Sequence, residues 1–305
     1  LAERYREAFQ RGLIGMDDID RALVRLFSAR YRSGDLAGLA QRQGRAAVPV
    51  DAIGSAAHQE LALRAAAKSL VLLKNDGVLP IRANAKVVLG GPQAGNLAVQ
   101  TGGWTLTWQG DDTRAADFPQ AELAVTAIKA AVRAGGGRIV DEADDLAGKD
   151  RPDVAIVILG ARPYAEMFGD IKLPVYNDRT GLRAIQTFKR LGIPTVTVFL
   201  SGRPLWMNPE INASNAFVAA WLPGSEGGGI ADVLVGTPEG KPRYDFTGKL
   251  SFPWPRSALL PPFASHGATE FPLGYGLSYA LPGHTPTLSE RIDGLSEAAP
   301  PVRVK

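Results

Sequence analysis

The spacing of hydrophobic and polar positions changes along the chain at about residue 50. Before it, apolar residues recur at helical spacing and are interrupted at Gly15. Asp17 and Asp18 then open a second helix, because acidic residues are favoured in a first turn. From 33 to 50 the pattern gives way to Gly, Ala and polar residues, which is typical of a linker. Residues 1–50 are therefore predicted to form a helical segment, at 1–33, and a linker.

Beyond residue 50, an Ala-rich helix predicted at about 58–69 precedes an alternation of apolar runs and amphipathic segments. The apolar runs are rich in β-branched residues and predict strands buried on both faces of a sheet, at 86–91, 153–160, 194–202 and 216–224. The segments between them predict helices at 122–134, 181–191 and 229–235. This alternation predicts an α/β fold, a layered α/β sandwich with a mostly parallel sheet, over 51–280. Residues 281–305 are Pro-rich and are predicted to be a tail or linker.

The predicted strand at 153–160 leads into a loop that carries Tyr164, Glu166 and Asp170. Ligands of parallel sheets bind beyond the carboxyl ends of the strands, so this loop lies at the edge where a site is expected. A loop glutamate is most often only solvated. Tyr164 and Phe168, however, would supply apolar walls that raise the pKa of Glu166 towards neutrality, as a general acid requires.

A second candidate is the stretch TGGWTLTWQGDD at 101–112, in which Trp104 and Trp108 lie four residues apart. Tryptophan pairs more often belong to a core. A loop rich in Gly and Thr is nevertheless a poor place for a core, and exposed indole faces suit stacking on a sugar ring. The pair is therefore a candidate for substrate binding.

Composition excludes several classes of function. A formal net charge of +3 without a long basic run does not indicate nucleic-acid binding. No apolar stretch approaches the roughly 18 residues that a membrane helix needs. Cysteine is absent and the three histidines show no ligand spacing, so no metal and no cofactor is predicted. The first residue is leucine, from which we expect upstream residues, with any signal peptide, to be missing or removed.

The glycine-rich run GSEGGG at 224–229 superficially resembles a phosphate-binding loop. It matches neither the Walker pattern nor the dinucleotide fingerprint, so its glycines are expected to allow tight packing of a strand against a helix. Ser201 and Ser225 lack a nucleophile-elbow pattern, which disfavours a serine hydrolase. Glu226 in this run is the next most plausible acid after Glu166.

Several blocks of sequence, in this order, carry a family resemblance. They are ALRAAAKSLVLLKNDGVLPI (62–81), GGWTLTWQGD (102–111), PYAEMFGD (163–170), VFLSGRPL (198–205), AAWLPGSEGGGIADVL (219–234), GKLSFPWP (248–255) and FPLGYGLSY (271–279). Together they resemble the second half of a family 3 glycoside hydrolase of the β-glucosidase and exo-β-glucanase branch.

The resemblance implies an N-terminal (β/α)₈ barrel, in the same precursor or in a partner chain, with the active site between barrel and sandwich. The barrel would carry the nucleophile, an Asp in a Ser-Asp-Trp context. Glu166 matches the acid/base glutamate, and Trp108, with Trp104 behind it, matches the tryptophan that lines the leaving-group sugar site. Tyr164 and Asp170 are further candidates for substrate contact. A β-glucan or β-glucoside substrate and a periplasmic or secreted location are also implied.

Two departures from the family pattern stand out. The chain contains no Ser-Asp-Trp, and residues 1–33 resemble only the last helices that lead out of the barrel. Ala161 replaces a common glutamate, and the stretch after Asp170 differs from the usual one.

Two hypotheses follow. The chain is the acid/base half of a retaining, exo-acting β-glucosidase or exo-β-glucanase that hydrolyses terminal β-D-glucosyl residues, and it is inactive alone. Alternatively, it is a non-catalytic glucan-binding or structural module of the same fold. Such a module would not need the acid loop PYAEMFGD.

Overall fold

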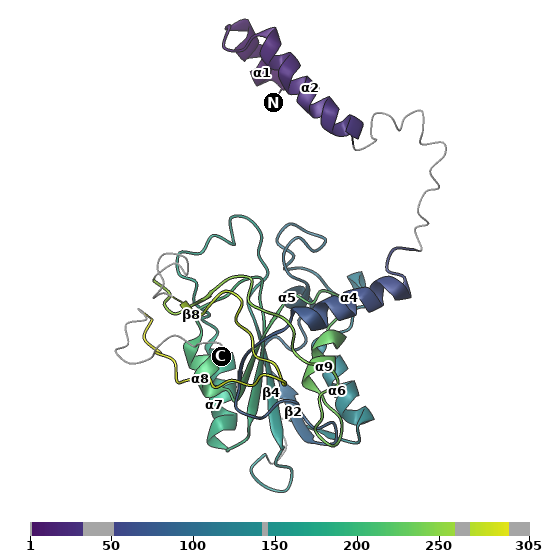
Figure 1. Cartoon of the computed structure of the whole chain (residues 1–305), viewed down its shortest axis with the longest axis vertical. Coiled ribbons are helices and arrows are strands. Elements are labelled where there is room, and N and C mark those ends of the chain that lie inside the picture. The colour runs from purple at the N-terminus through teal and green to yellow at the C-terminus, as the bar shows by residue number, and fades with distance from the viewer. Residues whose placement is uncertain (1, 33–51, 142–145, 260–268, 293–305) are drawn as a thin grey trace. The chain divides into compact units, whose positions relative to one another are not determined.

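The computed structural model describes residues 2–32, 52–141, 146–259 and 269–292 (Figure 1). The linker predicted at 33–50 and the last part of the predicted tail, 293–305, lie outside these residues. The chain divides into two compact units, Leu1–Ser55 and Ala56–Lys305, which are described separately.

The first unit contains helix α1 (Ala2–Gln10) and helix α2 (Met16–Arg32), which confirms the two helices predicted around a turn at Gly15. The carboxylate of Asp18 accepts a hydrogen bond from the backbone N–H of Gly15 at 2.9 Å, so a first-turn acid fixes the entry into α2. Neither helix has a buried residue, and Leu23, Leu26 and Phe27 of α2 remain exposed.

The second unit is built on a six-stranded sheet with the order β1-β6-β5-β4-β2-β3. All neighbouring strands are parallel except β1, which pairs antiparallel with β6, so the mostly parallel sheet is confirmed. The strands are β1 (Val71–Asn75), β2 (Lys86–Gly90), β3 (Arg138–Val140), β4 (Val154–Gly160), β5 (Thr195–Leu200) and β6 (Ala216–Trp221).

Alternate residues of β4 enter two separate cores, because successive strand side chains point to opposite faces. Val154, Ile156 and Ile158 pack in one hydrophobic cluster, and the intervening residues 155, 157 and 159 pack in the other. The first cluster includes residues of α6 (Ala124–Ala134) and α9 (Gly228–Leu234). The second includes residues of α7 (Arg179–Arg190) and α8 (Asn208–Ala213). Helices therefore cover both faces of the sheet (Figure 1).

Three further helical segments and a small hairpin complete the unit. Helix α4 (Ala56–Ser69) packs against α9, α5 (Leu97–Thr101) follows β2, and a 3₁₀ turn spans Ala115–Asp117. Strands β7 (Trp254–Pro255) and β8 (Thr269–Phe271) pair antiparallel, and their Trp254 and Phe271 are fully buried in the second core. Among the described residues, no helix combines the length and apolar character needed to cross a membrane.

The glycines of GSEGGG serve close packing. A Cβ on Gly229 would lie 2.8 Å from the backbone N of Ala67 and 2.9 Å from the carbonyl oxygen of Leu63, both in α4. The tight neighbour is thus a helix, not the strand that the sequence suggested. The glycines approach a helix because α9 packs between α4 and α6 on the same face of the sheet.

The segment after β8 returns to the first strand of the sheet. The N–H of Leu277 donates to the carbonyl of Leu72 at 2.9 Å. The hydroxyls of Tyr275 and Thr285 both donate to the carbonyl of Leu73, at 3.2 and 2.9 Å. Within the predicted tail, Leu288 is buried and its N–H donates to the side chain of Asn212 at 2.9 Å. As far as it is described, to residue 292, this segment packs on the unit.

Candidate active site

Glu166 lies in the loop that follows β4, at the carboxyl edge of the sheet. The loop is anchored by Pro163 and Ala165, which are buried, whereas Glu166 itself is exposed. Buried residues on one side of the acid and an exposed stretch after it leave the carboxylate at the surface. The loop therefore exposes the carboxylate of Glu166 at the carboxyl edge of the sheet.

The closest polar partner of the acid is a tryptophan from another loop. The indole Nε1–H of Trp108 donates a hydrogen bond to Oε2 of Glu166 at 2.6 Å, across 58 positions of sequence. This bond links the two segments that the sequence singled out independently. A hydrogen bond donated to a carboxylate stabilises its charged form.

The pKa of Glu166 therefore departs in the direction opposite to our expectation. The indole N–H of Trp108 holds the pKa of this carboxyl below its ordinary value. The predicted apolar walls do not form, because Glu166 is exposed and Phe168 is itself 72% exposed. Desolvation opposes the shift only weakly at this exposed position, so hydrogen bonding decides its direction.

Gln109, which the sequence did not single out, forms two hydrogen bonds with the backbone of the acid loop. Its Oε1 accepts the backbone N–H of Ala165 at 2.8 Å, and its Nε2 donates to the carbonyl of Glu166 at 3.1 Å. The amide thus satisfies a donor and an acceptor on the two residues that define the position of the acid. Its only sequence signal is its position next to Trp108. No sequence pattern indicates which residues a loop glutamine will hydrogen-bond.

The two loops meet backbone to backbone at Gly103. A Cβ at this position would lie 1.9 Å from the carbonyl oxygen of Tyr164, so no larger residue fits without separating the loops. Both loops also contain non-glycine residues with left-handed backbone, Trp104 (φ 63°), Leu106 (φ 61°) and Met167 (φ 72°). Such conformations cost of order 1–3 kcal/mol each and persist where surrounding contacts impose them.

The tryptophan pair does not belong to the core. Trp104 and Trp108 are 67% and 44% exposed, and their ring centroids lie 6.3 Å apart with the planes tilted by 43°. The backbone N–H of Trp104 donates to the carbonyl of Trp108 at 3.0 Å, which closes the turn that displays them. Both indoles are available to a ligand at this edge, and Trp108 is the one that also contacts the acid.

The other two candidate residues of the acid loop have different surroundings. Tyr164 is half-buried, and the guanidinium of Arg203 lies over its ring at 3.7 Å from the centroid. Asp170 is exposed, and its backbone N–H donates to the carbonyl of Met167 at 3.1 Å. Tyr164 is thus part of the loop's packing, and Asp170 is not brought into contact with the Trp108–Glu166 pair.

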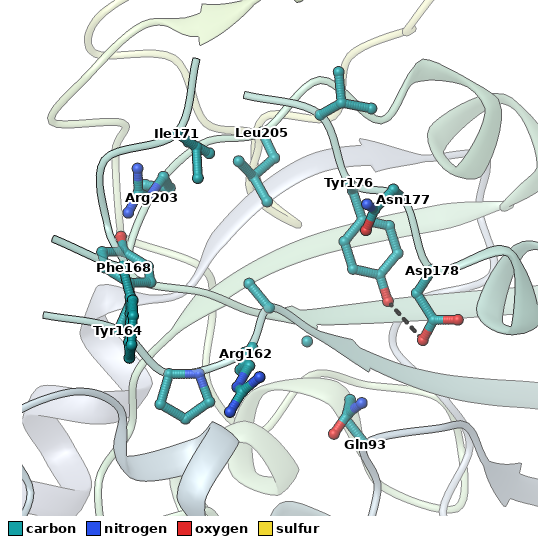
Figure 2. A pocket seen from close by; sticks show the side chains of 14 residues that line it. Gln93, Arg162, Tyr164, Phe168, Ile171, Tyr176, Asn177, Asp178, Arg203 and Leu205 are labelled. Atoms are coloured by element: carbon teal, nitrogen blue, oxygen red, sulfur yellow. Dashed lines mark hydrogen bonds between the residues drawn. The ribbon is translucent and has the colours of Figure 1, made fainter. Parts of the chain in front are cut away.

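A cavity of about 590 Å³ opens beside the acid loop (Figure 2). Tyr164 and Phe168 form part of its wall, but Glu166 and Trp108 do not line it. The other lining side chains come from the loops after β2, β4 and β5 and from the segment before α7.

The alternative acid, Glu226, lies in the loop between β6 and α9. It is half-buried, and the hydroxyl of Ser225 donates to its Oε1 at 3.0 Å. Burial and the charges of Glu226 and Asp232 raise the pKa of nearby Glu122. Within the described ranges, no group of three His, Cys, Asp or Glu side chains is arranged to hold a metal ion.

Replacing Trp108 by phenylalanine is expected to raise the pKa of Glu166 towards its ordinary value, because the indole N–H is the largest cause of its lowering. The pKa is measured by ¹³C NMR of the glutamate carboxyl carbons of this chain over a pH series. Trp104→Phe, which leaves the Trp108–Glu166 bond in place, is the control. An unchanged titration of Glu166 in Trp108→Phe would contradict the assigned cause.

Comparison with known proteins gives a consistent answer. The family model described as "Glycosyl hydrolase family 3 C-terminal domain" matches residues 70–279. The "Lysosomal beta glucosidase" of Dictyostelium discoideum is 30% identical over 90% of this chain and 36% of its own length. A "Probable exo-1,4-beta-xylosidase" of Neosartorya fischeri is 29% identical over 90% of this chain and 37% of its own length.

Among solved structures, the "exo-1,3/1,4-beta-glucanase" of a Pseudoalteromonas species superposes with a TM-score of 0.81 at 41% identity, over 95% of this chain and 37% of that chain. The chain thus spans well under half the length of the relatives that it matches. With a family match that covers most of its residues, the chain belongs to glycoside hydrolase family 3 and represents the C-terminal part of that family's proteins.

Proposed function

We propose that this chain is the acid/base-carrying part of a retaining, exo-acting β-glucosidase or exo-β-glucanase that hydrolyses terminal β-D-glucosyl residues. The observation that carries the proposal is the pairing of Trp108 with Glu166 at 2.6 Å on the exposed edge of the sheet. It joins an acid and an aromatic sugar-stacking surface, the two parts that the family resemblance assigns to this site. Gln109 holds the loop that presents them.

In retaining hydrolysis, one carboxylate attacks the anomeric carbon while a carboxylic acid about 5–5.5 Å away protonates the leaving oxygen. Glu166 is proposed as that acid. The nucleophile is proposed to lie on a barrel domain, in the same precursor or in a partner chain, because this sequence contains no Ser-Asp-Trp. The chain then supplies one of the two carboxyl groups.

The first step needs Glu166 protonated, whereas the Trp108 N–H favours its ionised form. A second carboxylate nearby and the exclusion of water both raise the pKa of a carboxylic acid. A covering barrel would bring both. Trp108 would then favour the carboxylate that forms once the proton has been given up. In the second step this carboxylate acts as the base for water.

The relatives support a glycoside substrate, but their names differ in the sugar that is released. The Pseudoalteromonas enzyme, at 41% identity, is called an exo-1,3/1,4-β-glucanase, and the Dictyostelium relative a β-glucosidase. The xylosidases, at 29% identity, are about as similar as the Dictyostelium β-glucosidase, at 30%, so the Pseudoalteromonas enzyme supports the choice of sugar. We therefore assign terminal β-glucosyl residues, with the exposed faces of Trp104 and Trp108 available to stack on the sugar beyond the scissile bond.

The test is the stereochemistry of the first product. In the complete enzyme, cleavage of an aryl β-D-glucoside is expected to release the β-anomer of glucose before mutarotation, because two displacements restore the original configuration. Proton NMR of the anomeric region during the first minutes of reaction measures this. The purified chain alone is the control and should show no turnover above buffer. Release of the α-anomer, or Glu166-dependent turnover by the chain alone, would contradict the proposal.

The exposed tryptophan pair also suits the second candidate, a non-catalytic glucan-binding module. That module predicts retardation of the chain in gels that contain β-glucan, and no hydrolysis by any longer protein that includes it. Hydrolysis by the complete protein that depends on Glu166 would exclude it.

A further inference from the structure

The acid loop makes a tight turn immediately after Glu166. The N–H of Phe168 donates to the carbonyl of Glu166 at 3.0 Å. The N–H of Gly169 donates to the carbonyl of Ala165 at 2.8 Å. Met167, within this turn, has a left-handed backbone with φ 72°, which a methionine adopts only where surrounding contacts impose it. The side chains of Met167 and Phe168 are exposed, so packing in the core does not impose it. The turn that carries the acid therefore depends on groups outside the loop.

Gln109 supplies both a donor and an acceptor to this turn. Its amide oxygen accepts the N–H of Ala165 at 2.8 Å, and its amide nitrogen donates to the carbonyl of Glu166 at 3.1 Å. An amide rotated by half a turn would place its oxygen against that carbonyl, so the present orientation is the one that satisfies both groups. A glutamate could only accept, and an asparagine is one methylene shorter, so neither reproduces the pair of bonds.

The backbone that presents Gln109 is itself held on both sides. The N–H of Trp104 donates to the carbonyl of Trp108 at 3.0 Å. The buried hydroxyl of Thr113 lies 3.3 Å from the carbonyl oxygen of Gly110 and also contacts another carbonyl of the same loop, at 3.2 Å. Gly110 is buried and has a left-handed backbone, with φ 69°. Both neighbours of Gln109 are thus fixed, and its amide is a rigid support for the acid loop.

Trp108 and Gln109 hold different parts of the acid. The indole of Trp108 binds the carboxylate, whereas Gln109 binds the main chain from which the carboxylate extends. Proton transfer needs the acid oxygen within about 2.6–3.2 Å of the leaving oxygen, and a displacement of about 1 Å can lower the rate about 10²-fold. We propose that Gln109 is a positioning residue, which fixes the main chain at Glu166 and thereby holds the carboxyl group in the geometry for proton transfer. This role rests on the proposed function of Glu166 as the acid/base.

The first measurement uses the purified chain and does not depend on catalysis. Gln109→Met keeps the length of the side chain and removes both amide groups. The backbone N–H of Ala165 is expected to exchange with deuterated water about tenfold faster in this variant than in the wild type, because its acceptor is lost. Exchange is followed by NMR, and the N–H of Val157 in β4 is the internal reference. Gln186→Met, an exposed change on α7, is the matched control and should leave Ala165 unchanged.

The second measurement uses the complete enzyme. Gln109→Met is expected to lower kcat/KM for an alkyl glucoside by about 10- to 10²-fold, because the acid is displaced from the leaving oxygen. A glucoside of an acidic phenol should lose less than about threefold, since the departure of this group needs little help from a proton. Loss of folded protein would lower both rates equally, so the difference between the two substrates reports the position of the acid. Gln186→Met should match the wild type on both.

The outcomes separate this role from the proposed function. Unchanged exchange of Ala165 in Gln109→Met, or an equal loss on both glucosides, overturns the positioning role. If Glu166→Ala shows the dependence on leaving group and Gln109→Met does not, the proposed function stands and the positioning role is rejected. If Glu166→Ala shows no such dependence, the proposed function fails and the positioning role fails with it. Circular dichroism and thermal unfolding verify that each variant is folded.

Discussion

Replacing Glu166 by alanine in the complete enzyme is expected to lower hydrolysis of a glucan or an alkyl glucoside by about 10²–10⁴-fold. This is the range that a positioned general acid contributes. The loss should shrink as the leaving group improves, because a phenolate with a low pKa departs with little help from a proton. The measurement is a series of glucosides with leaving groups of graded pKa, compared between wild type and Glu166→Ala.

The second step gives an independent signature of the same residue. Without a base to activate water, the glycosyl-enzyme should accumulate on substrates whose first step is still fast. Azide needs no base, so added azide should restore turnover and yield a β-glycosyl azide. Glu226→Ala is the matched control, since Glu226 is the other strand-end acid, and it should show neither effect. Equal loss on every leaving group without azide rescue would exclude Glu166 as the acid/base.

Replacing Glu210 by glutamine is expected to stabilise the chain at pH 8 by up to about 3 kcal/mol. Glu210 lies on α8 and is only 4% exposed. Burial, with the charges of Glu290 and Asp178 adding to it, raises the pKa of this carboxyl from 4.5 to about 7. A buried carboxylate without a cation is costly, and glutamine has nearly the same shape without the charge.

The sign of the pH dependence follows from the raised pKa. Below pH 4.5 the glutamate is protonated in both the folded and the unfolded chain, so it costs nothing. Between pH 4.5 and about 7 the unfolded chain loses the proton first, so stability falls as the pH rises. Above pH 7 the penalty is fully present. The wild type and Glu210→Gln should therefore have similar stability at pH 4 and differ most at pH 8.

Urea unfolding at a series of pH values measures the difference between the two proteins. Glu60→Gln, an exposed change on α4, is the control and should give a curve parallel to the wild type. Taking the difference between the curves removes the contributions of the other acids whose pKa is raised, Glu122, Asp232 and Glu270. A difference that does not grow between pH 4 and pH 8 would contradict the burial of Glu210 as its cause.

The central part of the fold could be predicted from the sequence because strands buried on both faces read as continuous apolar runs. β2, β4, β5 and β6 all have this property. β3 has only three residues, too few for any period to emerge. β1 carries Lys74, whose stem is buried while its Nζ donates to the carbonyl of Ile211 at 3.2 Å. In a strand of five residues, one charged residue is enough to interrupt the apolar run that would predict a strand.

The candidate site likewise has some features that could be predicted from the sequence and others that could not. Glu166 could be proposed because it follows a buried strand, which is a local signal. The direction of its pKa shift could not, because it depends on a tryptophan that arrives from 58 residues away. Gln109 was missed for the same reason, since its two partners belong to another loop. Contacts between loops come from the topology of the sheet, and a single sequence carries no local record of them.

The capping of β1 by the segment around Tyr275, Leu277 and Thr285 constrains the order of events during synthesis. β1 emerges from the ribosome about 200 positions before the residues that cover its outer edge. Until then an apolar strand edge is open to pairing with other chains. Contacts so distant in sequence also form slowly. We therefore expect nascent chains that stop before Tyr275 to require a chaperone, and truncation within 275–285 to lower soluble yield far more than its few contacts would indicate.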